Sequence, residues 1–204
     1  METVTSPAIR PATEADAERV AELLYLSAGG MYDRFAGGRD RALRVIDRGF
    51  ASEGNNSSRD VVTVAELGGE VAGALAAFPV DQMPERSSAF LRLTLRSIPP
   101  WRWPACLWLY WSGLRASPAP PEASLYVDAL GTATALRRRG VASALLEEAE
   151  RRALSLGLPA IALDTSLENK PARALYLSRG YEEVAYRPAG RRLPGFVALV
   201  KPLR

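Results

Sequence analysis

The sequence predicts a mixed α/β protein with helices packed on a central sheet, and three observations lead to this class. Residues 124–202 alternate β-prone with helical stretches, an order that places helices on the faces of a sheet. Residues 61–80 carry two β-prone runs around Gly68-Gly69, which predicts a β-hairpin. With 204 residues and a 48% hydrophobic composition, the chain is long enough for one buried core. We therefore expect residues 1–204 to form a single domain.

The N-terminal part opens with a strand and two helices, followed by a polar loop and the hairpin. Thr13 can cap the first helix together with Asp16, three residues further on. The second helix ends near Gly49. The stretch EGNNSSRD is rich in turn-forming residues and predicts a polar turn or a flexible loop. The expected elements are a strand in 8–13, a helix over 13–28, a helix over 40–50, the loop over 53–60 and the hairpin over 61–80.

Residues 81–123 differ in composition from the rest of the chain and indicate an insertion rich in tryptophan, arginine and proline. This segment holds all four tryptophans, and no acidic residue stands between Glu85 and Glu122. We expect two short helices here, roughly over 87–97 and 104–114, separated by PPWRWP. The arginines of this acid-free stretch are Arg86, Arg92, Arg96, Arg102 and Arg115.

The C-terminal half alternates strands and helices. Gly157 is a typical C-terminal stop for the helix that follows the strand SLYVDALGT. The last helix starts near Asn169, has Pro171 in its first turn and ends at Gly180. The expected elements are a strand over 124–132, a helix over about 140–156, a strand over 159–166, a helix over 169–180, and closing strands over 182–187 and 196–203.

The composition excludes several kinds of chemistry. The chain has no histidine, which rules out Ser-His-Asp and Cys-His catalysis and most zinc sites, so we expect no metal. Cys106 is the single cysteine, so an internal disulfide is excluded, and this residue is more typical of a core than of a nucleophile. A net charge of +3 is too small to indicate nucleic-acid binding.

The expected location is the cytoplasm. A single cysteine fits a reducing compartment, and the first residues show no signal-peptide pattern. The longest apolar run, over 104–114, is too short to span a bilayer, so we expect no stable membrane insertion.

The stretch RRRGVASALL, residues 137–146, predicts an anion-binding helix start. The first N–H groups of a helix have no partner within it, and the helix dipole favours negative charge there by roughly 0.3–1 kcal/mol. Gly140 and Ala142 leave room for a phosphate to approach those groups. Three arginines at this end of a helix are otherwise unfavourable, because like charge repels the positive end of the dipole. A solvated basic turn is the alternative interpretation of the same stretch.

This stretch resembles the pyrophosphate loop of the GCN5-related N-acetyltransferase (GNAT) family, written [QR]-x-x-G-x-[GA], which Arg137 to Ala142 match. The strand YVDALGT stands before it. Further on, LDTSLENKPARALYLSRGY resembles the family's second signature, and IRPATEADAERVAELL and FVALVKPL are similar to its first strand–helix and last strand. The residues that match the second signature are Asn169, Ala172, Tyr176, Gly180 and Tyr181.

The resemblance covers most of the chain except residues 81–123 and implies the GNAT fold. In this fold a mixed central sheet of about six to seven strands is flanked by helices, and the insertion would lie between the third and fourth strands. The cosubstrate implied is acetyl-CoA. Backbone N–H groups of the preceding strand would face its acetyl and pantetheine parts. The implied cofactor-binding residues are Leu130, Gly131, Thr132, Arg137, Arg138, Arg139, Gly140, Val141, Ala142, Ser143, Asn169, Ala172 and Tyr176.

The resemblance also implies direct transfer of the acetyl group to an amine, without a covalent enzyme intermediate. We expect Tyr176 to be the acid that protonates the leaving thiolate, the alternative being a packing role. Asp128 is the candidate base, acting through water, with a structural carboxylate as the equally weighted alternative. Asp164, on the next strand, is a further candidate. Asn169 shares a helix face with Tyr176 and is alternatively only a helix N-cap.

The expected function is an acyl-CoA-dependent N-acetyltransferase that acts on a primary amine of a small molecule or peptide. The alternative is a catalytically silent acyl-CoA-binding module of the same fold. By resemblance, residues 26–59 and the insertion of 81–123 would set the choice of acceptor. The insertion could instead cover the sheet, form a dimer interface, as many relatives are dimers, or contact a membrane peripherally through a basic, Trp-rich surface.

Overall fold

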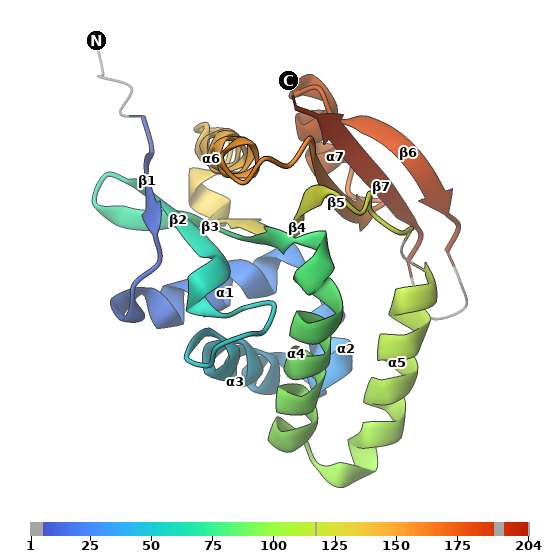
Figure 1. Ribbon diagram of the computed structural model, residues 1–204. Coiled ribbons are helices and arrows are strands. Elements are labelled where there is room, and N and C mark those ends of the chain that lie inside the picture. Colours follow the sequence, from blue (N-terminus) through green and yellow to red (C-terminus); the bar gives the residue numbers. More distant parts are fainter. Residues whose placement is uncertain (1–5, 117, 190–193, 204) are drawn as a thin grey trace.

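The protein is described from a computed structural model, in which residues 6–116, 118–189 and 194–203 are placed (Figure 1). Residue 117 of the predicted insertion lies outside this description. The placed residues form a seven-stranded sheet in the order β1-β2-β3-β4-β5-β7-β6. Only β4 and β5 run parallel; every other neighbouring pair is antiparallel. The strands are β1 (Ala8–Pro11), β2 (Val62–Leu67), β3 (Glu70–Pro79), β4 (Ser124–Thr132), β5 (Ala160–Ser166), β6 (Glu182–Arg187) and β7 (Phe196–Pro202).

Helices cover both faces of this sheet, which confirms the predicted mixed α/β class. In Figure 1, α1 and α3 lie on one side of the sheet and α6 and α7 on the other. The helices are α1 (Ala17–Ser27), α2 (Met31–Ala36), α3 (Arg39–Phe50), α4 (Met83–Ser97), α5 (Trp103–Ala116), α6 (Val141–Ser155) and α7 (Lys170–Ser178).

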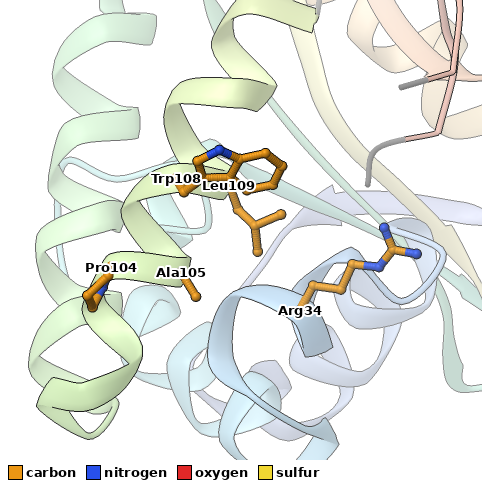
Figure 2. A pocket seen from close by; sticks show the side chains of 5 residues that line it. All are labelled: Arg34, Pro104, Ala105, Trp108 and Leu109. Atoms are coloured by element: carbon orange, nitrogen blue, oxygen red, sulfur yellow. The ribbon is translucent and has the colours of Figure 1, made fainter. Parts of the chain in front are cut away.

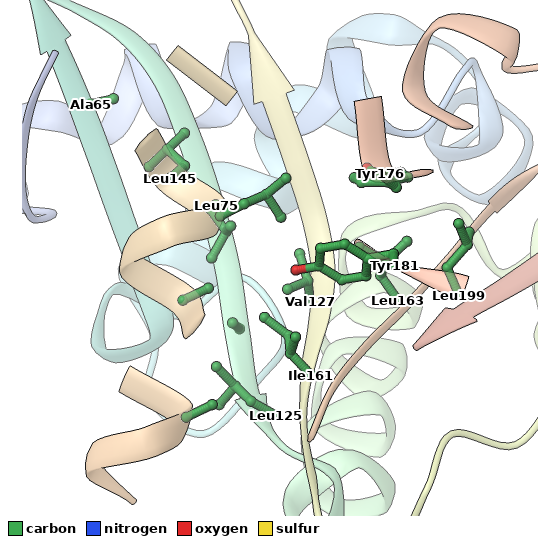
Figure 3. Close-up of a cluster of buried hydrophobic side chains, with 14 of the residues drawn as sticks. Ala65, Leu75, Leu125, Val127, Leu145, Ile161, Leu163, Tyr176, Tyr181 and Leu199 are labelled. Atoms are coloured by element: carbon green, nitrogen blue, oxygen red, sulfur yellow. The ribbon is translucent and has the colours of Figure 1, made fainter. Parts of the chain in front are cut away.

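Each face of the sheet has its own apolar core. Figure 3 shows the cluster under α6, which includes Leu145 of that helix and Leu75 and Val127 of the central strands. On the opposite face, Leu24 of α1 and Ile46 of α3 belong to a second buried cluster. The sheet is therefore apolar on both faces, as expected for a sheet covered on both sides.

The first helix begins at Ala17, later than predicted, because a 3-10 turn over Glu14–Asp16 precedes it and is capped by Thr13. The Thr13 backbone N–H and hydroxyl donate hydrogen bonds of 2.7 and 2.8 Å to the Asp16 carboxylate, which confirms the capping pair. Asp16 also accepts a bidentate pair of hydrogen bonds from Arg10 of β1, and Arg10 in turn pairs with Glu66 of β2. These bonds fix β1 at the edge of the sheet against the start of α1.

The insertion contributes two helices between the third and fourth strands, as predicted, and both are longer than expected. α4 packs on α3, and α5 packs on α2 and α4. Cys106 of α5 lies in the apolar cluster that these helices share, where burial raises the pKa of its thiol to about 11. None of the helices in the placed parts of the chain combines the length and apolarity needed to cross a membrane.

The polar stretch after α3 is not a flexible loop, which corrects that alternative. Asn55, Ser57 and Ser58 are buried. The Asn55 side-chain N–H donates to the carbonyl of Gly49 at 2.9 Å, and its Oδ1 accepts from both the N–H and the hydroxyl of Ser57. A Cβ at Gly49 would collide with the Ser57 hydroxyl, so the loop lies directly on the end of α3. This packing holds the neighbouring Asn56 against the sheet.

Candidate active site

Strand β4 carries an irregularity at the centre of the sheet. Ala76 of β3 pairs with Ala129 and Ala77 pairs with Val127, so Asp128 is an extra residue in β4. Such a bulge bends the strand and redirects a side chain, and bulges are frequent next to active sites. On the other edge, the parallel pairing with β5 ends at Val127 and Leu163, although both strands continue. The β4 edge that faces away from β3 therefore has no strand partner beyond this point.

A cavity of about 340 Å³ opens beside this free end of β4. Its walls come from the end of α1, the end of β4, the loop before α6, the first turn of α6 and the first two turns of α7. Twelve of the thirteen residues predicted to bind the cofactor line it; Arg139 does not. The lining residues are Leu26, Ser27, Leu130, Gly131, Thr132, Leu136, Arg137, Arg138, Gly140, Val141, Ala142, Ser143, Asn169, Pro171, Ala172, Leu175 and Tyr176.

The loop before α6 has the backbone of an anion-binding turn. Arg138 and Gly140 both have left-handed φ values, 63° and 80°. Arg138 is the sole non-glycine residue with positive φ in the part of the chain that is described, and such strain gathers at functional sites. The Ala144 N–H bonds to the Gly140 carbonyl at 2.9 Å, so the N–H groups of the three preceding residues have no partner further back in the helix. The first turn of α6 contains no acidic residue.

The site residues fit the phosphates of an acyl-CoA. Helix α6 has 15 residues, which is long enough for a substantial dipole, and its N-terminus opens on the cavity. A Cβ added to Gly140 would meet no atom within 4 Å, so this glycine is required by its backbone angle and not by packing. Gly131 differs, because a Cβ there would collide with the Leu23 carbonyl of α1. Close packing of α1 on β4 explains that glycine independently of any ligand.

Tyr176 is buried on α7 and lines the cavity. Its ring lies 5.8 Å from that of Tyr181, between centroids, within the core cluster of Figure 3. Burial, and then the negative charge of Asp164, raise the pKa of Tyr176 to about 12. The phenol therefore keeps its proton at neutral pH and is able to donate it.

Asn169 is the N-cap of α7, which is the alternative role that the sequence predicted for it. Its Oδ1 accepts a hydrogen bond of 3.4 Å from the Ala172 N–H. The residue also lines the cavity together with Tyr176, two turns further along the helix. The capping role and a ligand contact are compatible in this position.

Asp128 does not line the cavity and lies in a polar cluster on the α2 side of β4. The Asn56 amide donates a hydrogen bond of 3.0 Å to its Oδ1. Burial, and then the charge of Asp164, raise the pKa of Asp128 to about 7, whereas the bond from Asn56 acts to lower it. The hydroxyl of Tyr126 donates to Asp164 on the neighbouring strand. A partly buried carboxylate with a pKa near 7 has the pKa required of a general base.

The sequence analysis did not find Asn56. It lies in the stretch interpreted as a polar loop, and 72 positions separate it from Asp128, so no local spacing connects them. Its Oδ1 is buried and has no hydrogen-bond partner among the described residues. An unpaired buried acceptor beside a carboxylate is suited to receive N–H groups from a ligand. The abundance of asparagine and serine in the loop was the available signal, because such residues often satisfy buried backbone groups.

Solved structures share this fold at low sequence identity. An N-acetyltransferase from Staphylococcus aureus Mu50 aligns with a TM-score of 0.71 and 19% identity, covering 95% of this chain and 99% of its own. A protein described as histone acetyltransferase HPA2 and related acetyltransferase, from Corynebacterium glutamicum, aligns with a TM-score of 0.64 and 21% identity, covering 98% of both chains. A third structure, described as an acetyltransferase, has a TM-score of 0.67, 18% identity and coverage of 97% and 100%. No curated protein sequence matches the chain significantly.

The model of the acetyltransferase (GNAT) family matches residues 31–181. This range includes both predicted signatures, the insertion and the strand that carries Asp128. The match spans most of the chain and agrees with the resemblance inferred from the loop before α6 and the signature on α7. The chain belongs to the acetyltransferase (GNAT) family of enzymes.

Proposed function

We propose that the protein transfers an acetyl group from acetyl-CoA to a primary amine of a small molecule or peptide, by direct transfer in the cytoplasm. The observation that carries the proposal is the arrangement on the two sides of β4. The cavity at the α6 N-terminus is suited to an acyl-CoA, and a carboxylate with a pKa of about 7 stands two residues before the strand end that lines this cavity. We further propose that residues 1–204 act as one domain, since α2, α3 and the insertion helices share a buried apolar cluster.

In this proposal the loop before α6 holds the pyrophosphate of acetyl-CoA. The unpaired N–H groups of Val141, Ala142 and Ser143 supply hydrogen bonds, and Arg137 and Arg138 at the cavity wall add positive charge. When bound, acetyl-CoA supplies an acetyl group activated as a thioester. The free edge of β4 from Leu130 to Thr132 offers backbone N–H groups to orient it, and donors of this kind typically contribute about 3–4 kcal/mol to catalysis.

Asp128 acts as the base toward the acceptor amine. An alkyl ammonium must lose a proton before it attacks, and a carboxylate titrating near pH 7 accepts it at its oxygen, directly or through one water. The buried Asn56 Oδ1 beside it accepts a second N–H of the same ammonium group. This pair of acceptors favours a cationic amine over a neutral alcohol as the acceptor.

Tyr176 acts as the acid. Its hydroxyl retains its proton at neutral pH, because burial raises its pKa to about 12, and it gives this proton to the sulfur atom that leaves. A thiolate whose conjugate acid has a pKa near 8.5 is a weaker base than the phenolate, so Tyr176 first stabilises the charge that develops on sulfur through a hydrogen bond, and transfer of the proton to sulfur follows. Its proton is restored from solvent after the product leaves.

Calorimetric titration with acetyl-CoA tests the donor site. The variant Ala142→Trp fills the cavity at the helix start without changing a glycine of unusual backbone angle, and we expect it to weaken binding at least about tenfold, or 1.4 kcal/mol. The matched control is Leu154→Trp, an exposed position on the same helix that does not line the cavity. Release of free thiol with a panel of primary amines then tests transfer.

The outcomes separate the two candidate functions. Binding that is lost in Ala142→Trp, with amine-dependent thiol release, supports the proposal. Binding without thiol release for any amine tested supports the alternative, a silent acyl-CoA-binding module. Absence of binding to the unmodified protein overturns both.

A further inference from the structure

A depression of about 530 Å³ lies between the end of α3, the loop that follows it and one face of α4. Its volume falls within the range of sites that bind small molecules. Ala89, Arg92, Leu93 and Arg96 recur at helical spacing and form its α4 wall. Among the described residues, none lines both this depression and the cavity at the start of α6, so the two are separate sites.

Three arginines converge on this depression from two helices. Arg48 belongs to α3, and Arg92 and Arg96 stand one turn apart on α4. The Arg48 guanidinium donates a hydrogen bond of 3.1 Å to the Ser97 hydroxyl, which holds it against α4. The ion pairs within the described residues involve none of the three arginines. The lining contains one carboxylate, the exposed Glu53, so positive charge is in excess.

Helix electrostatics explain only part of this arrangement. Arg48 and Arg96 stand in the last turns of their helices, where positive charge interacts favourably with the helix dipole. Arg92 lies in the interior of α4, four residues before Arg96, and like charges at this spacing repel. Arg86 of the same helix is compensated, because it pairs with Asp60 at 2.7 Å. An anion from outside would compensate the arginines of the depression in the same way.

The cavity between α2 and α5, of about 590 Å³, differs in character from this depression. Figure 2 shows its lining, in which one guanidinium, that of Arg34, stands across from the apolar side chains of Trp108 and Leu109. Three guanidiniums from two helices distinguish the depression between α3 and α4 as a surface suited to several anionic groups at once.

We propose that the depression between α3 and α4 binds a small multivalent oxyanion, a molecule that carries at least two phosphate or carboxylate groups. The planar guanidinium pairs with either group through two parallel N–H bonds, and a ligand needs several such groups to engage more than one arginine. This inference goes beyond the proposed function and does not depend on it.

The loop that forms one wall of the depression also supports the candidate base. Asn55 lines the depression and is buried, with its backbone N–H bonded to the Ser58 hydroxyl at 2.7 Å. The next residue, Asn56, donates to Asp128. A ligand in the depression would therefore contact the loop that positions Asn56.

The charges disfavour a second copy of the chain as the occupant. A two-fold contact centred on this depression would bring Arg92 and Arg96 of both copies together, and like charges at an interface cost free energy. A nucleic acid also fits less well, because a polyanionic strand needs a basic groove that tracks its backbone, whereas a concave site of this volume encloses a small molecule.

Calorimetric titration at low ionic strength tests the proposal. The probes are citrate and inorganic pyrophosphate, with acetate as the monovalent control. We expect citrate, pyrophosphate or both to bind, acetate not to bind at the same concentration, and added salt to weaken the binding. Tighter binding of one probe assigns the natural ligand to carboxylates or to phosphates.

Matched variants locate the site. Arg92→Gln with Arg96→Gln is expected to weaken probe binding at least about tenfold, since two guanidinium contacts are lost. The control, Arg44→Gln with Arg115→Gln, removes the same charge at exposed positions that do not line the depression, and should leave the affinity unchanged. Ala142→Trp should also leave this binding unchanged, which separates it from any pyrophosphate held by the loop before α6. Circular dichroism melts verify that each variant is folded.

Three results would overturn the proposal. The first is that neither probe binds to the folded protein. The second is an equal loss of affinity in the double variant and in its control, which would indicate general attraction to a positively charged protein. The third is a mixed-sequence RNA oligonucleotide that binds more tightly than both probes and is released by the double variant, because a nucleic acid would then be the occupant.

Discussion

At the scale of single residues, the bulge at Asp128 has the largest consequence for chemistry. An extra residue in β4 turns this carboxylate toward Asn56 and places it near Asp164, and the two neighbours act on its pKa in opposite directions. The negative charge of Asp164 favours the protonated form, whereas the hydrogen bond from Asn56 favours the ionised form. The balance, dominated by burial, places the pKa near neutrality.

The pH dependence of kcat/KM is expected to follow this balance. With one acceptor amine, activity should rise as the pH increases through about 7, because the ionised form of Asp128 is the base. Asp164→Asn removes a negative charge, so the inflection should move to lower pH. Asn56→Ala removes the hydrogen-bond donor to the Asp128 carboxylate, so the inflection should move to higher pH. Profiles of kcat/KM against pH for the unmodified protein and the two variants measure the pH of the inflection. Shifts in the same direction for both variants would refute the assignment of the inflection to Asp128.

Tyr176 yields a second prediction at this scale. Tyr176→Phe removes the proton donor but keeps the ring in its core position, so kcat should fall by about 10²-fold with little change in stability. Tyr181→Phe is the matched control, because its ring contacts that of Tyr176 but the residue does not line the cavity. Turnover assays and thermal melts compare the two; equal loss of kcat in both would indicate a packing role for Tyr176.

At the scale of elements, the contact between α1 and β4 holds the site together. Gly131 lies where the backbone of α1 approaches the strand, and its position also lines the cavity. The end of α1 forms part of the same cavity wall. The packing of helix on strand and the shape of the site therefore depend on the same close approach.

Two glycine substitutions are expected to have opposite effects on stability. Gly131→Ala forces α1 away from β4, and we expect a loss of about 1–3 kcal/mol in the free energy of unfolding. Gly113→Ala, within α5, meets no atom within 4 Å and should gain about 0.5–1 kcal/mol, because alanine favours the helix. Denaturant unfolding measures both. A neutral Gly131→Ala would mean that α1 is not held at this distance.

At the scale of the whole molecule, the partly buried position of Asp128 reduces stability at neutral pH. In the unfolded chain this carboxyl loses its proton near its ordinary pKa of 3.8, whereas in the folded protein it keeps the proton until about pH 7. The folded state therefore binds more protons than the unfolded state between these values. The free energy of unfolding falls as the pH rises across this window.

Asp128→Asn should accordingly stabilise the protein more at pH 8 than at pH 5. At pH 5 the folded protein already carries a neutral Asp128, whereas at pH 8 the variant removes a buried charge, so we expect the gain to be larger by about 1–3 kcal/mol. Urea unfolding at the two pH values measures it, with the exposed Asp47→Asn as control. A gain that is equal at both pH values would contradict the burial of an ionisable base.

Some elements were not predictable from local patterns. Helix α2 has only six residues, and glycines with left-handed φ stand at both of its ends, so it lacks the polar caps that mark a helix in sequence. It forms because Tyr32, Phe35 and Ala36 contribute to the apolar cluster shared with α3 and α5. The strands over 124–132 and 182–187, by contrast, have the predicted bounds, since β-prone runs between turn residues identify them locally.

By itself the sequence determined the alternation of strands and helices, the glycine-marked start of α6 and the positions of Asn169 and Tyr176 on one helix. These features depend on residues a few positions apart, and chain geometry alone relates them. The tertiary structure decided the partnership of Asn56 with Asp128, the proximity of Asp164 and the exposure of Trp101 and Trp111. Each of these depends on which distant segments of the chain meet and on how much water they exclude. The pKa of a carboxylate and the solvation of an indole ring follow from that environment.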